Sequence, residues 1–134
     1  MPGAFLDSNV LVYAFTADAR AERAKTLVAD GGTISVQVLN EFANVARRKL
    51  GMDWRELREA VATIRVLCPV ILPVDVDIHD EALRLAERYR IGIYDGAVIA
   101  AALKARCDTL WSEDLQHGLV IDRQTRIVDP FRPA

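Results

Sequence analysis

Residues 4–15 read AFLDSNVLVYAF and place one aspartate, Asp7, between two apolar runs. Apolar runs of this kind enter a core, where an ionised carboxylate is unfavourable unless something compensates its charge. One interpretation is that Asp7 ends a short strand and caps a helix that begins at Asn9. The other is that Asp7 holds a cation. The rest of the chain has to decide between a cap and a cation site.

The composition is that of an ordinary globular protein. The 134 residues are 51% hydrophobic and 27% charged, which predicts one domain, residues 1–134, with a single core. The net charge of −2 provides no general basic surface, so contact with nucleic acid requires a local basic patch. We expect no membrane segment and no signal peptide, because neither a long apolar run nor a basic start is found. Cys68 and Cys107 lack zinc spacing and are expected to be buried thiols in a cytoplasmic protein.

Short apolar strands alternate with helices along the chain. This order predicts an α/β fold with a parallel sheet of four to five strands flanked by helices. Ligands of such sheets bind outside the carboxyl ends of the strands. The expected strands are residues 4–6, 33–35, 70–72, 109–111 and 126–128. The expected helices are residues 9–15, 18–30, 35–50, a helix opening at 53, about 79–90, and one within 93–107.

Four carboxylates occupy positions that a structural role explains incompletely. Asp7 and Asp114 each follow an expected strand. Taken alone, Asp7 is explained equally well by a helix cap and by a functional role, and Asp114 is explained as a turn residue. Glu41 borders an apolar helix stripe, between Val38 and Val45. Asp95 starts a helix that is apolar almost all round, so its N-terminus is expected near the middle of the protein.

Four acids at one sheet edge would need a counter-charge. Two like charges about 4 Å apart repel by about 4 kcal/mol at an effective dielectric constant of about 20. No Lys or Arg adjoins any of the four in sequence. Oxygen ligands without a Cys/His cluster favour Mg²⁺ or Mn²⁺ over zinc. Such a cation activates water and neutralises phosphate oxygens, which is the chemistry of a phosphodiester hydrolase.

Four segments resemble, in order and spacing, the acidic motifs of PIN-domain ribonucleases, above all the VapC-type toxins of bacterial toxin–antitoxin pairs: FLDSNVLVYAF, SVQVLNEFANVARRK, IYDGAVIAAAL and LWSEDLQHG. The resemblance extends from Ala4 to about Val128. It implies a PIN-like three-layer fold and a Mg²⁺- or Mn²⁺-dependent endoribonuclease, the toxin of a type II pair. The catalytic residues and metal ligands would be Asp7, Glu41, Asp95 and Asp114, with Asp7 and Asp95 the most direct ligands, Asp114 next and Glu41 acting through water.

The resemblance also implies residues and partners beyond the four acids. Asn9 and Ser112 stand where the family often has polar residues lining the site, although turn and capping roles explain them equally well. Gln116 stands where some relatives have a further acid, so the number of metal ions stays open. The implied partners are an RNA substrate, a cognate antitoxin and a second copy of the chain in a homodimer.

Two basic clusters are candidates for RNA contact, but a solvated helix face is the simpler interpretation of both. They are Arg47–Lys49 and the set Arg20, Arg23 and Lys25. His117, close to Asp114, is expected to be structural.

Other functions fit the sequence less well. A phosphatase of the haloacid-dehalogenase type needs a second Asp two places after Asp7, where Asn9 stands. A response-regulator receiver needs an earlier acidic pair and a late lysine, and neither is found. The remaining alternative is a catalytically silent PIN-fold module that binds RNA or a protein. The presence of all four acids argues against that alternative.

Overall fold

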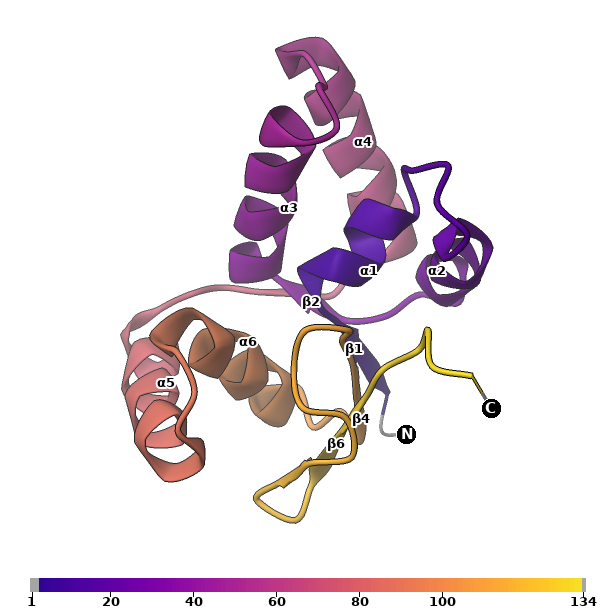
Figure 1. Ribbon diagram of the computed structural model, residues 1–134. Coiled ribbons are helices and arrows are strands. Elements are labelled where there is room, and N and C mark those ends of the chain that lie inside the picture. The colour runs from indigo at the N-terminus through magenta and orange to yellow at the C-terminus, as the bar shows by residue number, and fades with distance from the viewer. Residues whose placement is uncertain (1–2, 134) are drawn as a thin grey trace.

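A largely parallel sheet runs through the centre of the computed structural model, which describes residues 3–133 (Figure 1). Four strands form the main sheet in the order β1-β4-β6-β5, and only β5 is antiparallel to its neighbour. Strands β2 and β3 form a second parallel pair, which continues beyond β1 through one bridge between Phe5 and Thr33. The strands are β1 (Ala4–Leu6), β2 (Ile34–Ser35), β3 (Ile71–Leu72), β4 (Thr109–Trp111), β5 (Val120–Ile121) and β6 (Thr125–Val128).

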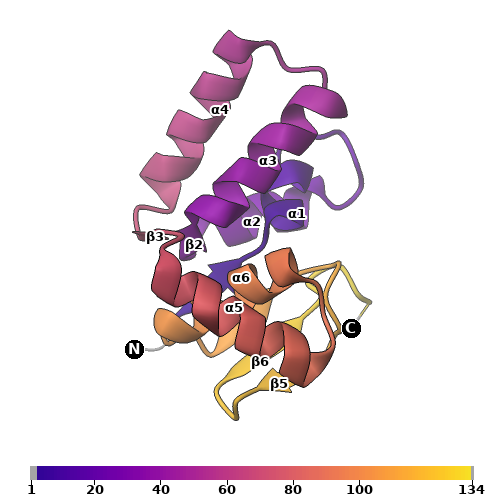
Figure 2. The same ribbon diagram turned by 90° about the vertical axis from the view of Figure 1, so that its left-hand side faces the viewer.

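Helices flank the sheet, which confirms the expected α/β class. Helices α5 and α6 lie side by side on one side of the sheet, and α2 lies on the other (Figures 1 and 2). Helices α3 and α4 form a hairpin that projects away from the sheet in both views. The helices are α1 (Ser8–Tyr13), α2 (Ala21–Ala29), α3 (Val36–Arg48), α4 (Trp54–Leu67), α5 (Val76–Tyr89) and α6 (Ile93–Lys104).

Local side-chain caps explain where several helices begin. The Ser35 hydroxyl accepts from the Val38 amide at 3.3 Å and so caps α3, which begins where the sequence places it. Asp53 and Glu56 form a reciprocal capping box at the start of α4, which opens at the expected residue. Helix α5 begins three residues before the expected His79, because the Asp75 carboxylate caps it.

One expected helix boundary was wrong. Helix α2 begins at Ala21 and not at residue 18, because the Asp18 carboxylate accepts from the Arg20 amide at 2.8 Å in the preceding turn. Trp54, in the first turn of α4, is 58% exposed. The Arg47 guanidinium lies over its ring, 4.3 Å from the centroid.

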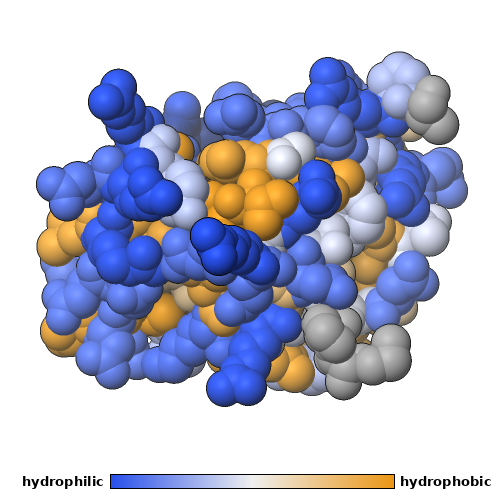
Figure 3. Space-filling view, turned by 90° about the horizontal axis from the view of Figure 1, so that it is seen from below, coloured by the Kyte–Doolittle hydropathy of each residue, from blue (hydrophilic) through white to orange (hydrophobic). Residues whose placement is uncertain are grey.

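The core lies between the sheet and the helices that cover it. Cys68 and Cys107 are buried free thiols, as expected from the sequence. Seen from below, the surface is mostly hydrophilic around an apolar patch near its centre (Figure 3). Within residues 3–133 no helix has the length and apolar character needed to cross a membrane. The largest fully buried side chains include Phe5, Leu11, Ile34, Phe42, Ile64, Ile99, Leu110 and Ile127.

A glycine sets the distance between α5 and α6, and with it the position of Asp95. A Cβ atom built on Gly96 would lie 2.6 Å from the backbone oxygen of Ala82 in α5. Backbone atoms cannot move aside as a flexible side chain can, so the two helices approach this closely only because residue 96 has no side chain. Asp95, the preceding residue, is thereby held at the start of α6.

We expect Gly96→Ala to lower the free energy of unfolding by about 1–3 kcal/mol, because the added methyl group forces α5 and α6 apart. Alanine is the better helix former, so helix propensity alone would make the variant more stable. A loss of stability would therefore indicate the packing clash. Urea unfolding measures the effect. Gly3→Ala is the control, since no atom lies within 4 Å of a Cβ built there. Equal stability of the two variants would contradict the close approach.

Candidate active site at the ends of β1 and β4

Asp7 directly follows β1 and is only 5% exposed. It caps α1, because Oδ1 accepts from the Ser8 amide at 2.7 Å. Its other oxygen, Oδ2, accepts from the Ser112 hydroxyl at 2.7 Å and from the Asn9 amide at 3.3 Å. All of these donors are neutral, so the cap interpretation is correct but leaves a buried charge without a counter-charge.

The surroundings raise the pKa of Asp7 to about 6. Burial is the main cause, because it penalises the ionised form. Hydrogen bonds from Ser112 and Ser8 act in the opposite direction, and the negative charges of Glu41 and Asp114 raise the pKa further. The influence of these two acids shows that they lie within electrostatic reach of Asp7.

Glu41 and Asp95 face the same region from α3 and α6. Partial burial raises the pKa of the half-buried Glu41, and the charges of Asp95 and Asp114 add to this effect. Partial burial is also the main cause of the raised pKa of Asp95, and the negative charge of Asp114 raises it further. The structure therefore brings together all four acids that the sequence singled out.

The position expected for Asp95 was wrong in one respect. The buried stretch of α6 is Gly96–Ala102, and Asp95 itself is exposed in the first turn. The apolar helix begins at the protein surface and then enters the core, so Asp95 stands at the opening of the site rather than in the middle of the protein.

Asn9 and Ser112 connect the acids. The Asn9 amide nitrogen donates to Asp7 and, at 3.4 Å, to Asp114, while its carbonyl oxygen accepts from the Glu113 amide at 3.0 Å. Ser112 is fully buried and accepts from the Asp114 and Leu115 amides, both at 3.2 Å. These two side chains therefore tie the loop after β4 to the start of α1. This double connection could not be predicted from the sequence.

Within residues 3–133 no Lys, Arg or His side chain forms an ion pair with any of the four acids. Glu113, beside Asp114, is different: it accepts from the Tyr13 hydroxyl at 2.6 Å and pairs with Arg20 at 2.8 Å. His117 accepts from the Asp129 amide at 3.0 Å, as a structural residue would. Glu113 is thus paired with a protein cation, whereas its neighbour Asp114 has no such partner in the described part of the chain.

The donor set suits a hard divalent cation. In the part of the chain that the structure describes, no three His, Cys, Asp or Glu side chains are arranged as a ready metal cage. Mg²⁺, however, is usually held by one or two carboxylates, with waters and substrate phosphates as its other ligands. Uncompensated carboxylates at the opening of a site fit that mode of binding.

The PIN domain family matches residues 4–119 of the chain. The chain belongs to the PIN domain family. Toxin VapC20 of Mycobacterium tuberculosis, which cleaves the sarcin–ricin loop, is similar in structure at 23% identity and a TM-score of 0.66, covering 83% of this chain and 91% of VapC20. A toxin–antitoxin complex from Klebsiella pneumoniae gives 18% identity and a TM-score of 0.73 over 97% of this chain and 99% of that one.

VapBC2 of Rickettsia felis, solved with a DNA fragment from its promoter, gives 18% identity and a TM-score of 0.60, covering 83% of this chain and 86% of that one. Comparison with curated proteins gave no match. The family match confirms the expected PIN domain family, and the structural similarity confirms the expected fold. The matched region contains all six residues expected to form or line the site: Asp7, Asn9, Glu41, Asp95, Ser112 and Asp114.

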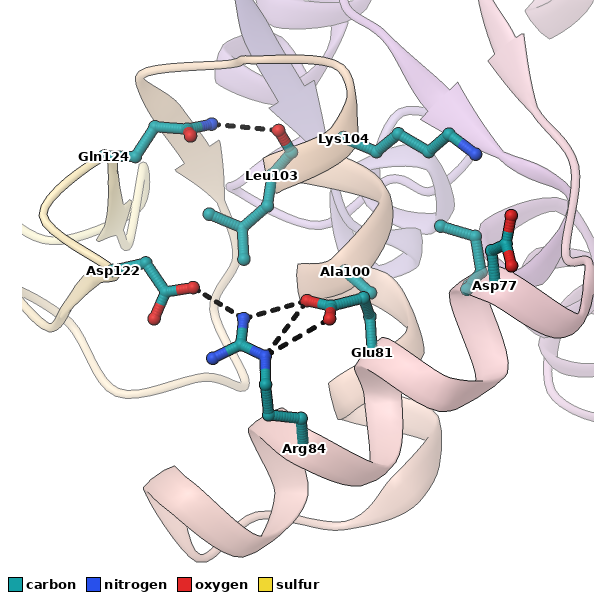
Figure 4. A pocket seen from close by; sticks show the side chains of 9 residues that line it. Asp77, Glu81, Arg84, Ala100, Leu103, Lys104, Asp122 and Gln124 are labelled. Atoms are coloured by element: carbon teal, nitrogen blue, oxygen red, sulfur yellow. Dashed lines mark hydrogen bonds and ion pairs between the residues drawn. The ribbon is translucent and has the colours of Figure 1, made fainter.

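A charged cavity of about 260 Å³ lies apart from the four acids, between α5, α6 and the loop after β5 (Figure 4). Arg84 lies there between Glu81 and Asp122, at 2.8 and 2.6 Å. The Gln124 amide donates to the Leu103 carbonyl at 2.9 Å. Because these polar groups are paired with one another, the cavity is better explained as a joint between elements than as a reaction site.

We expect Asp7→Asn to stabilise the metal-free PIN domain at neutral pH. The folded carboxyl has a pKa of about 6, above its ordinary value of 3.8, so the folded protein binds this proton more tightly than the unfolded chain. The contribution of Asp7 to stability is therefore full below about pH 4 and is lost as the pH rises through about 6. The variant has no such loss, although a reoriented Ser112 hydroxyl offsets part of the gain.

The variant should exceed the wild type by about 1–3 kcal/mol at pH 7 and by much less at pH 4. Urea unfolding in EDTA at several pH values measures the difference. Asp80→Asn, at an exposed position of α5, is the control. A difference that does not change with pH would show that burial does not destabilise the charged form of Asp7.

Proposed function

We propose that this PIN domain is a metal-dependent endoribonuclease that hydrolyses RNA phosphodiester bonds, as the toxin of a type II toxin–antitoxin pair. The observation that supports it most is a set of four carboxylates in which burial and like charges raise the pKa values of Asp7, Glu41 and Asp95, and none of the four has an ion-pair partner within the described residues. Such a cluster is unfavourable for folding alone, which indicates a functional role. The similarity to VapC20, a toxin that cleaves RNA, is in accord with this proposal.

In this proposal Asp7, Asp95 and Asp114 hold Mg²⁺ or Mn²⁺, and Glu41 acts through water. When bound, the cation makes water a better nucleophile and neutralises charge on the phosphate. Burial would then no longer penalise ionised Asp7, because the cation supplies the missing counter-charge.

The chain's other residues keep these carboxylates in place. The Ser112 hydroxyl and the Ser8 amide hold the two oxygens of Asp7 in fixed directions. Asn9 links Asp7 to Asp114 across the chain. Gln37 donates to Oε2 of Glu41 at 3.2 Å and so restricts that side chain on α3. Pre-positioned carboxylates lower the reorganisation needed when substrate arrives.

Partner binding belongs to the same proposal. A homodimer and a cognate antitoxin would both need exposed apolar surface, and several large apolar side chains near β3 are exposed. They include Val66, Val70, Val74 and Val76, with exposed fractions of 78, 57, 43 and 73%. Size-exclusion chromatography with light scattering would show whether the purified chain is dimeric.

Asp95→Asn should reduce metal-dependent RNA cleavage by more than about a hundredfold, because it removes a charged ligand from the opening of the site. The assay follows cleavage of a structured RNA in Mn²⁺ or Mg²⁺, with EDTA as the metal-free comparison. Asp80→Asn provides the control for loss of one exposed acid. Circular dichroism should show an intact fold. Wild-type cleavage in Asp95→Asn would place the reaction elsewhere, and a wild type without cleavage would favour a silent binding module.

Millimolar Mn²⁺ should raise the melting temperature of the wild type by about 3–10 °C, since a ligand that binds only the folded state stabilises it by mass action. The shift should be much smaller for Asp95→Asn and unchanged for Asp80→Asn. Differential scanning fluorimetry across a Mn²⁺ titration measures it. The absence of any shift at saturating Mn²⁺ would count against metal binding by these acids.

A further inference from the structure

A cavity of about 290 Å³ opens beside the acids, between α1, the end of α3 and the loop after β4. Asn9 and Asp114 form part of its wall, so the cavity is continuous with the candidate active site. Its volume lies near the lower end of the range of small-ligand pockets, about 300–1,000 Å³. A space of this size suits one nucleotide better than a folded protein segment.

Much of the cavity wall is apolar and one part is aromatic. Val12, Val45 and Leu50 contribute aliphatic surface, and Tyr13 contributes its ring. The Tyr13 hydroxyl donates to Glu113, and its ring forms a T-shaped pair with Phe131 at 5.0 Å between centroids. The Arg20 guanidinium lies over one face of the ring, 5.0 Å from its centroid, so a base would use the other face. These contacts fix the ring, and a fixed aromatic ring beside aliphatic groups is a suitable surface for a flat base.

Lys49 brings a positive charge to this cavity. Of the three consecutive basic residues at the end of α3, only Lys49 lines it. Arg47 is held elsewhere, over the Trp54 ring and on the Met52 carbonyl at 2.8 Å. Among residues 3–133, no acid forms an ion pair with Lys49. Its ammonium group is therefore available to a phosphate.

We propose that this cavity is the subsite for the nucleotide next to the cleaved phosphodiester bond, with the base against Tyr13 and Val45 and the phosphate paired with Lys49 Nζ. The inference rests on the proposed function, since it takes RNA as the substrate. RNA supplies both features that the cavity matches, an apolar flat base and a negative phosphate. The neighbouring acid Glu113 is already neutralised by Arg20 and Tyr13, so it opposes the phosphate less than a free carboxylate would.

Nucleotide binding can be tested without turnover. The probes are the four nucleoside 5′-monophosphates, titrated while NMR follows the methyl groups of Val12, Val45 and Leu50. We expect saturable shifts of these signals with at least one nucleotide. Lys49→Gln should weaken that binding at least about fivefold and Lys49→Arg should preserve it. Arg48→Gln, one residue away on the exposed surface, is the matched control and should change it less than about twofold.

Cleavage kinetics provide the second measurement, on a labelled structured RNA in Mn²⁺. Lys49→Gln should raise KM about five- to tenfold and leave kcat within about twofold, because the contact is made in the ground state as well as in the transition state. The slope of log(kcat/KM) against log[salt] should become shallower by about one, as expected for one lost phosphate contact.

Two results would overturn the subsite: methyl signals that do not move at saturating nucleotide, or a Lys49→Gln variant that behaves as Arg48→Gln does. Either would leave a partner protein as the occupant to consider for the cavity. A wild type that binds nucleotides here but cleaves no RNA would support nucleotide binding in the cavity, and it would contradict the nuclease proposal.

Discussion

The arrangement of this PIN domain depends on a buried carboxylate that has no ion-pair partner among residues 3–133. Asp7 is 5% exposed, and neutral groups provide its hydrogen bonds. Those bonds lower its pKa, but burial and neighbouring acids raise it to about 6, so the folding of the metal-free protein works against the charged form. A helix cap alone would need only Ser or Thr. A carboxylate buried without a counter-charge reduces stability, and exceptions of this kind are expected at functional sites.

The register of the sheet determines which side chains lie beside Asp7. Strands β1 and β4 are adjacent and parallel, with Leu6 opposite Trp111, so the residues that follow them emerge at the same edge. Asp7 and Ser112 therefore form a hydrogen bond although 105 positions separate them in the chain. A shift of one residue would send these side chains to opposite faces. The same reasoning applies to α6, whose close contact with α5 through Gly96 fixes where Asp95 stands.

Sequence patterns predicted the parts of this arrangement that follow general rules. Acids placed directly after buried strands were expected to converge, and Asp7 and Asp114 do so. The exposure of Asp95 was not predicted, because apolar periodicity shows which residues of a helix are buried but not how far its first turn extends beyond the core. Strand β5 was also missed: its hairpin turns at Asp122 and Arg123, which have φ of 49° and 58° without the glycine that usually marks such turns. Tyr89 and Arg84 from α5 hold Asp122 in that turn, which is a tertiary contact that no local pattern reveals.

The distribution of cations around the acids is consistent with a surface arranged for a nucleic acid strand. Glu113 and Asp114 are adjacent in sequence, yet only Glu113 receives an arginine, Arg20, and a tyrosine hydroxyl. A protein that only needed to relieve repulsion would gain more by placing that arginine at Asp114, whose charge adds to burial in raising the pKa of Asp7, Glu41 and Asp95. Instead Asp114 keeps its charge, which the proposed divalent cation would need, and Lys49 lines the adjoining cavity. In the proposed function one phosphate would lie at the cation and the next at Lys49, and that arrangement needs negative acids beside a positive side chain.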